Sequence, residues 1–187
     1  MEKLRIISEF HLERVLDAYG VDTKLYGTGD KKDLEDLFVE INSGESDLFE
    51  IEDGSLLRVI RTVNLFLFHK KNNNEFEFLR EREQIFSDGR VKIRNLIPSL
   101  SEKRKFDEDP ILALQRGIHE ELGISIDPGQ LMVLPSREEI KQSKSYLLNT
   151  KNYLDDYFYL LEQDSYREEY TEIQEKKTVY FSWQKVL

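Results

Sequence analysis

Apolar residues recur at helical spacing in two stretches near the start of the chain. Residues 8–20 carry one such stripe behind Ser8, a favourable N-cap residue, and residues 28–45 carry a second with Asp30 as a possible cap. Small, charged turn segments separate the two stretches. The pattern predicts that residues 1–55 are mostly helical.

The pattern changes at residue 56 to one that is typical of strands. Residues 56–70 are rich in β-branched and aromatic side chains, and residues 76–86 and 90–97 alternate between apolar and polar positions over much of their length. Turn signals separate these segments, and a polar loop follows at 98–109. The sequence therefore predicts an antiparallel meander.

A third helix is predicted at residues 110–122. Pro110 stands at its first position behind Asp109 as N-cap, which is a favoured arrangement, and Gly123 is the expected residue just beyond its end. Its apolar stripe consists of Ile111, Leu114, Ile118 and Leu122. These four are spaced to face one core.

The remaining residues alternate between apolar and charged segments. Strands are predicted at 131–134, within 153–164 and at 178–183. Residues 137–152 fit either a helix or a loop, and residues 165–177 read as a charged loop. The order of elements predicts an α+β or mixed α/β domain at 56–187, with a helix packed on a sheet, preceded by the helical extension at 1–55.

Composition narrows the classes of function. The 187 residues carry 27 basic and 37 acidic side chains, a net charge of −10, which disfavours binding to duplex nucleic acid. There are no cysteines, which excludes disulfides, zinc–thiolate sites and thiol nucleophiles, and the three histidines lie far apart. No signal peptide is evident, and the longest apolar run is too short to span a membrane. We expect a cytoplasmic protein with no membrane association.

The helix at 110–122 carries the candidate chemistry. Glu120 and Glu121 are about 100° apart around the helix axis, so both can reach one cation at a helix edge. Arg116 lies four residues before Glu120, close enough to orient it by an ion pair. Carboxylate oxygens suit Mg²⁺ or Mn²⁺, which bridge phosphate oxygens in phosphoryl chemistry. A glutamate pair alone is more often a solvated helix face.

A wider pattern around this pair resembles the box of the Nudix hydrolase family, G-x5-E-x7-R-E-U-x-E-E-x-G-U, where U is aliphatic. Residues 102–124 match seven of its nine specified positions. The matching residues are Glu108, Arg116, Ile118, Glu120, Glu121, Gly123 and Ile124.

The resemblance implies an α/β/α sandwich with a mixed sheet and the hydrolysis of a pyrophosphate bond. The substrate would be a nucleoside diphosphate linked to another moiety, and Mg²⁺ or Mn²⁺ would be needed. In that scheme Glu120 and Glu121 are metal ligands, Arg116 positions a carboxylate, and Glu108 and Gly123 support the site.

Two positions depart from the box. Glu102 replaces the leading glycine, and Gly117 replaces the glutamate that follows the arginine. That missing carboxylate often serves the family as a metal ligand or base. Glu138 and Glu139 are candidates to replace it, because some family members take their base from a later loop, although plain solvent exposure is the alternative.

Substrate contacts are predicted more weakly. Lys103 and Arg104 precede the box helix in its loop and could contact substrate; simple loop solvation is the alternative. Arg58 on a predicted strand could reach a phosphate; surface ion pairing is its alternative role. Two functions follow from these residues. One is a metal-dependent pyrophosphohydrolase, favoured by the glutamate pair; the other is a catalytically impaired module that senses a ligand or binds a protein, favoured by Gly117.

Overall fold

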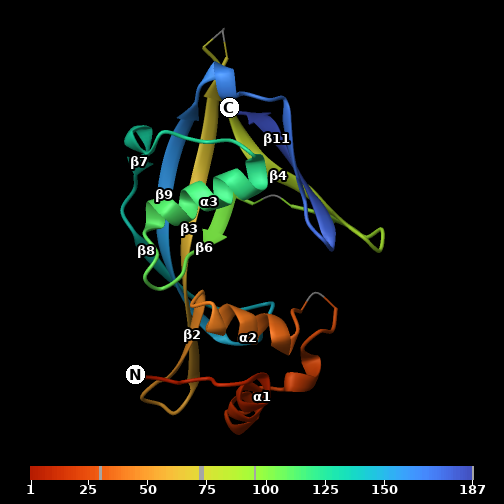
Figure 1. The fold of residues 1–187 in the computed structure, drawn as a ribbon, viewed down its shortest axis with the longest axis vertical. Coiled ribbons are helices and arrows are strands. Elements are labelled where there is room, and N and C mark those ends of the chain that lie inside the picture. The colour runs from red at the N-terminus through yellow and green to blue at the C-terminus, as the bar shows by residue number, and fades with distance from the viewer. Residues whose placement is uncertain (30, 72–73, 95, 187) are drawn as a thin grey trace. The chain divides into compact units, whose positions relative to one another are not determined.

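The computed structural model describes residues 1–29, 31–71, 74–94 and 96–186, which form an α+β fold (Figure 1). The chain divides into two compact units. The first unit consists of Met1–Thr62, Lys103–Glu108 and Ser136–Leu154, and the second of Val63–Glu102, Asp109–Pro135 and Asp155–Leu187. The first unit thus gathers two later segments in addition to the N-terminal residues. The proposed boundary at residue 55 stays a prediction.

The first unit contains two helices and short strands around one core. Its elements are β1 (Glu2–Lys3), α1 (Glu9–Ala18), the 3₁₀ turn η1 (Thr23–Leu25), α2 (Leu34–Asn42), β2 (Ser46–Glu50), the beginning of β3 (Leu56–Lys70), β8 (Arg137–Gln142) and the beginning of β9 (Asn149–Leu161). The strand β2 pairs antiparallel with β1 and β3, and β8 pairs antiparallel with β9. The buried core consists of Leu12, Leu16, Leu37, Leu48, Leu56, Tyr146 and Leu148.

Local capping fixes where both N-terminal helices begin. The Ser8 hydroxyl accepts a hydrogen bond from the backbone N–H of His11 at 3.1 Å, as the sequence predicted for α1. The cap of α2 is Asp33, whose carboxylate accepts from the N–H of Asp36 at 2.7 Å. The predicted cap Asp30 lies outside the described residues.

The second unit is a sheet with one long helix. It contains the rest of β3 and β9, together with β4 (Phe76–Phe86), β5 (Val91–Ile93), β6 (Leu100–Lys103, whose last residue belongs to the first unit), α3 (Pro110–Leu122), the turns η2 (Pro128–Gln130) and η3 (Gln163–Ser165), β7 (Met132–Val133), β10 (Glu169–Ile173) and β11 (Lys177–Lys185). The strand β4 pairs antiparallel with β3, β5 and β11, and β10 pairs antiparallel with β11.

The sheet is mixed, because β3 and β9 run in the same direction. Asn64 on β3 donates to Asp156 on β9 at 2.6 Å, and farther along both strands His69 bonds the backbone carbonyl of Leu161 at 3.1 Å. Their arrows point the same way in Figure 1. The predicted α+β class with a mixed sheet is therefore confirmed.

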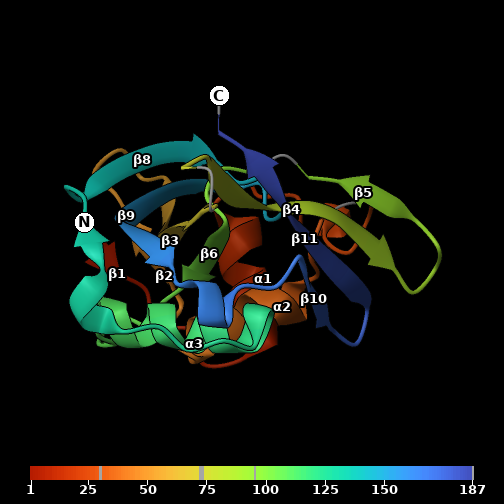
Figure 2. The same ribbon diagram turned by 90° about the horizontal axis from the view of Figure 1, so that it is seen from above.

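Helix α3 covers one face of this sheet, as Figures 1 and 2 show. Its buried residues Leu114 and Ile118 are fully inaccessible to solvent and join a core built from alternate residues of β3, namely Val63, Leu65 and Leu67. The predicted apolar stripe is thus the face that packs on the sheet. Ile111 is only partly buried at its edge.

Five strands of the described residues lie where the sequence pattern did not predict them. They are β1 and β2 in the region expected to be helical, β6 in the expected polar loop, β8 in the segment left open between helix and loop, and β10 in the expected charged loop. Each is short and carries charged residues, so its alternation is weak. The partner strands supply the backbone hydrogen bonds that make these segments extended.

No helix in the described part of the chain is long and apolar enough to cross a membrane.

Capping of α3 gives a first prediction. The Asp109 carboxylate accepts from the N–H groups of Ile111 and Leu112 at 2.8 and 3.2 Å, so Asp109→Ala leaves two helix donors without this partner. We expect the free energy of unfolding to fall by about 1 kcal/mol. Urea denaturation measures it, with the exposed Asp107→Ala as the control. Equal effects of the two variants would contradict a capping role.

Candidate functional site

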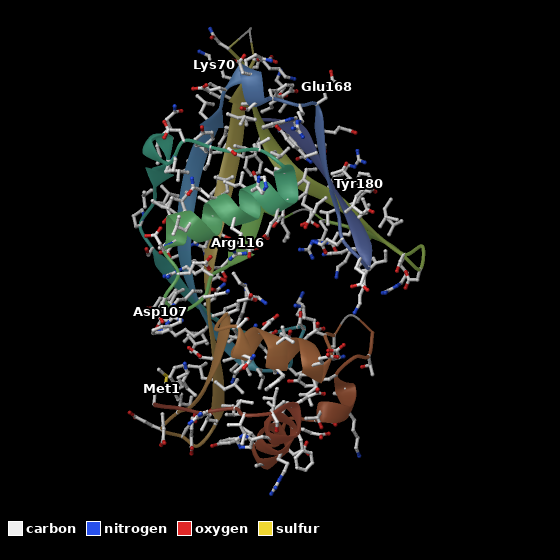
Figure 3. All side chains as sticks on the ribbon, in the orientation of Figure 1. Met1, Lys70, Asp107, Arg116, Glu168 and Tyr180 are labelled. Atoms are coloured by element: carbon white, nitrogen blue, oxygen red, sulfur yellow. The ribbon has the colours of Figure 1, made fainter. Side chains whose placement is uncertain are left out.

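The predicted site residues Arg116, Glu120 and Glu121 lie in the second half of α3, and Figure 3 shows Arg116 on this helix. The helix ends at Leu122, because Gly123 adopts a left-handed conformation with φ of 62° and its N–H bonds the carbonyl of His119. The glycine that matches the box is therefore the helix stop.

Arg116 forms ion pairs of different length with two carboxylates. Its Nη1 atom lies 2.6 Å from Oε1 of Glu102 on β6 and 3.7 Å from Oε2 of Glu120, one helical turn later. The Glu102 side chain is 22% exposed and that of Glu120 is 57% exposed. The tighter, more buried pair is the one with Glu102, so the residue that Arg116 chiefly positions is on the neighbouring strand.

Gly117 is buried against that same strand. A Cβ atom added to it would lie 3.0 Å from Cβ of Glu102, 3.1 Å from Cγ of Glu102 and 3.3 Å from a methyl carbon of Leu100. Contacts this short require a neighbour to move. The space in front of the helix at position 117 is therefore taken by Glu102.

Glu121 sits in an environment that disfavours its charge. Burial, and to a smaller extent the negative charges of Glu172, Glu102 and Glu81, together raise its pKa to about 8, while Lys177 opposes them. The carboxyl group is therefore largely protonated at neutral pH.

Glu121 also lines a cavity of about 160 Å³ in the second unit. The strands β4, β10 and β11 and the segment around β6 supply the rest of the lining. Its polar side chains are Glu81, Gln84, Arg94, Ser99, Ser101, Glu121, Glu172, Gln174 and Lys177. With Glu121 protonated, two carboxylates face two cations among these residues. The cavity is thus nearly neutral and offers both hydrogen-bond donors and acceptors.

The box implies a divalent metal held by carboxylate side chains. Carboxylate oxygens are the right donors for Mg²⁺ or Mn²⁺. However, no three His, Cys, Asp or Glu side chains among the described residues form a group that could hold a metal ion. Glu102, the carboxylate beside position 117, is engaged by Arg116. The box residues as folded do not fit a metal.

Glu108 belongs to the first unit, where its carboxylate accepts from the backbone N–H of Lys105 at 2.9 Å. Arg104 donates to the backbone carbonyl of Glu108 at 2.9 Å. These contacts order the loop before α3. The contact of Arg104 with substrate and the supporting role of Glu108 both stay predictions.

Arg58 and Lys103, the other predicted substrate contacts, both bind Glu40 in the first unit. The Arg58 guanidinium is buried and lies 2.5 Å from Oε2 of Glu40, and Lys103 forms an ion pair with the same carboxylate. Both residues form ion pairs in this structure, and their role in contacting substrate stays a prediction.

Glu138 and Glu139 lie on strand β8, where the sequence had indicated a loop. Glu138 is exposed and pairs with Lys151 at 2.7 Å, and Glu139 pairs with Arg137 and Lys141 at 2.7 and 2.9 Å. The role of either glutamate as a replacement base stays a prediction. Both are in the first unit, whereas the box glutamates of α3 are in the second.

The cavity residues other than Glu121 were not foreseen. Glu81, Glu172 and Lys177 come from three separate strands and Arg94 directly follows β5, and no local motif links them. They come together only because the strands of the sheet pair with one another. The one available signal was that charged residues such as Glu81 occur inside a strand pattern.

The chain has no match among protein-family profiles or curated protein sequences. Among solved structures it is similar to the Ap4A hydrolase of C. elegans, at 16% identity and a TM-score of 0.36, over 68% of this chain and 80% of that one. It is similar to the Nudix domain of Shewanella oneidensis NrtR, complexed with ADP ribose, at 15% identity and a TM-score of 0.39, over 67% and 71%.

A third similar structure is RenU, a Nudix hydrolase from M. smegmatis, at 14% identity and a TM-score of 0.33, over 74% of this chain and 79% of that one. The structural neighbours of this chain thus include Nudix hydrolases, at low sequence identity.

Proposed function

We propose that this chain binds a nucleotide-type small molecule through the cavity beside Glu121 and does not hydrolyse it with a metal. One observation carries this proposal. The helix position that the box gives to a further carboxylate is Gly117, and the residue that covers it, Glu102, is held by Arg116. The third carboxylate is thus committed to an ion pair, which leaves the impaired, ligand-sensing alternative as the better supported one.

The cavity chemistry indicates which part of a ligand it would take. Gln84 and Gln174 present amides that both donate and accept, as the hydroxyls of a ribose or the edge of a base require. Lys177 and Arg94 supply cations for a phosphate group. Burial lowers the pKa of Lys177, so a phosphate beside it would favour its charged form.

Metal-dependent hydrolysis of a pyrophosphate bond is the second candidate, since α3 retains Arg116, Glu120 and Glu121. The 3.7 Å separation of Arg116 from Glu120 is consistent with the positioning role that the box implies. In this reading Mg²⁺ or Mn²⁺ would be held by Glu120 and Glu121, after a rearrangement that frees both carboxylates.

Calorimetric titration and phosphate release with a panel of nucleoside diphosphate derivatives test both candidates, each with and without Mg²⁺ or Mn²⁺. We expect binding of at least one compound without metal and no turnover above background. Lys177→Ala removes a cation from the cavity and is expected to weaken binding about tenfold or more. The exposed neighbour Lys176→Ala is the control and should bind as the wild type does.

Two results would overturn the proposal. Turnover that needs metal and disappears in Glu121→Gln would establish the hydrolase instead. Failure of every compound in the panel to bind, with or without metal, would exclude a nucleotide-type ligand.

A further inference from the structure

The two positions at which the chain departs from the Nudix box are in direct contact. Glu102 and Gly117 are 15 residues apart in sequence, yet the Cβ of Glu102 lies 3.0 Å from the place where a Cβ of residue 117 would be. Nothing in the sequence links the two departures. The fold makes them one feature.

Their contact couples the sizes of the two side chains. A glutamate at 117 would meet Cβ and Cγ of Glu102, which are near its backbone and cannot swing away as the end of a long side chain does. Leu100 closes the same space at 3.3 Å. With Glu102 in place, a side chain at position 117 therefore requires Glu102 or Leu100 to shift, and glycine avoids that strain.

The exchange also conserves a carboxylate next to Arg116. The box places a glutamate directly after the arginine and a glycine at the strand position; here the strand position carries the glutamate and the helix carries the glycine. The carboxylate of Glu102 accepts a hydrogen bond from Nη1 of Arg116 at 2.6 Å, and its Cβ and Cγ fill the space beside position 117.

We propose that Glu102 and Gly117 are a reciprocal exchange, in which Glu102 supplies from β6 the carboxylate that α3 lacks at 117. Glu102 is then a positioning residue: it holds Arg116 and fills the space beside the helix. The exchange is also the reason why the box residues do not assemble a metal site, and this second part rests on the proposed function.

A double-mutant cycle with Glu102→Gly and Gly117→Glu tests the coupling by thermal unfolding. Overpacking in Gly117→Glu is expected to lower the Tm by about 5 °C, and loss of the ion pair and of packing in Glu102→Gly by a similar amount. The double variant relieves the clash and restores a carboxylate beside Arg116. Its Tm should recover to near that of the wild type, so the two changes are strongly non-additive.

Binding of Mn²⁺ alone, followed by calorimetry and by the rise in Tm, tests the chemical part. The double variant is expected to gain a Mn²⁺-dependent rise that the wild type lacks. The matched control combines Glu102→Gly with Gly117→Gln, which has the same size without the charge. It should recover the part of the stability that comes from packing and gain no Mn²⁺ response.

The outcomes separate the two proposals. Additive losses of Tm in the double variant would overturn the exchange itself. Recovery of Tm without a Mn²⁺ response would overturn its link to the metal site. A Mn²⁺ response in the wild type would overturn the metal-independent function and leave the steric coupling intact.

Discussion

Replacing Glu40 with alanine is expected to lower the free energy of unfolding by about 3 to 5 kcal/mol, because it leaves the buried Arg58 guanidinium without its counter-ion. Glu40 lies on α2 and is 5% exposed. Its carboxylate binds Lys32 at 2.9 Å, Arg58 at 2.5 Å and Lys103, and it accepts a hydrogen bond from the Tyr146 hydroxyl at 2.9 Å. Three cations thus depend on one carboxylate.

The buried guanidinium of Arg58 makes the loss large. Its side chain is 4% exposed, its Nε atom donates to Ser46 at 2.8 Å, and its charge lies 4.8 Å from the centre of the Tyr146 ring. Without Glu40 this charge would be solvated neither by water nor by an anion. Urea denaturation at pH 7 measures the effect, with the exposed Glu35→Ala on the same helix as control.

The same network predicts how the effect depends on pH. Burial alone would raise the pKa of Glu40, but the charges of Lys103 and Arg58 outweigh it and lower the pKa to about 2. A carboxyl group whose pKa is lower in the folded state stabilises the fold above its ordinary pKa, near 4.5, and loses that contribution as the pH falls towards 2. The difference between wild type and Glu40→Ala should therefore shrink between pH 4.5 and pH 2. A difference that stays constant over this range would exclude the ionised network.

Glu121→Gln is expected to make the protein more stable at pH 8 by an amount on the order of 4 kcal/mol, while at pH 5 the two proteins are much closer. Burial raises the pKa of Glu121 to about 8, so between pH 4.5 and pH 8 the folded state binds more protons than the unfolded state. Stability therefore falls as the pH rises through this range. Glutamine has nearly the same shape and cannot ionise.

Urea denaturation at several pH values from 5 to 8 measures this difference. Glu120→Gln, on the same helix but with a side chain 57% exposed, is the control for removing a carboxylate from α3. If Glu121→Gln changed stability equally at pH 5 and pH 8, burial would not be what controls this carboxyl group. The cavity could then no longer be treated as nearly neutral.

The helices illustrate how far local sequence reaches. The beginnings of α1 and α3, with Ser8 and Asp109 as caps, and the end of α3 at Gly123 agree with the sequence prediction. Capping satisfies backbone groups within one turn, so the residues that decide it are adjacent in sequence. The apolar stripe of α3 and the strands β3, β4, β9 and β11 were predictable for a similar reason, because periodicity reports the buried face.

The short strands and the ion pairs were not predictable in this way. The segment that forms β10 is charged, and it is extended because it pairs with β11 from Glu169 opposite Ser182 to Ile173 opposite Thr178. Arg58 resembled a surface residue that could meet phosphate, and only the fold shows that it is buried against Glu40. Such contacts depend on which elements meet, and periodicity carries no information about that.

The sequence by itself determined the class of fold, the helix that carries Arg116, Glu120 and Glu121, and the two departures from the box at 102 and 117. Only the tertiary structure decided that these departures touch, that Arg116 prefers Glu102 and that Glu121 is partly buried and lines a polar cavity. The physical reason is that charge state and available space are set by neighbours brought together from distant strands, and those neighbours exist only once the sheet has formed.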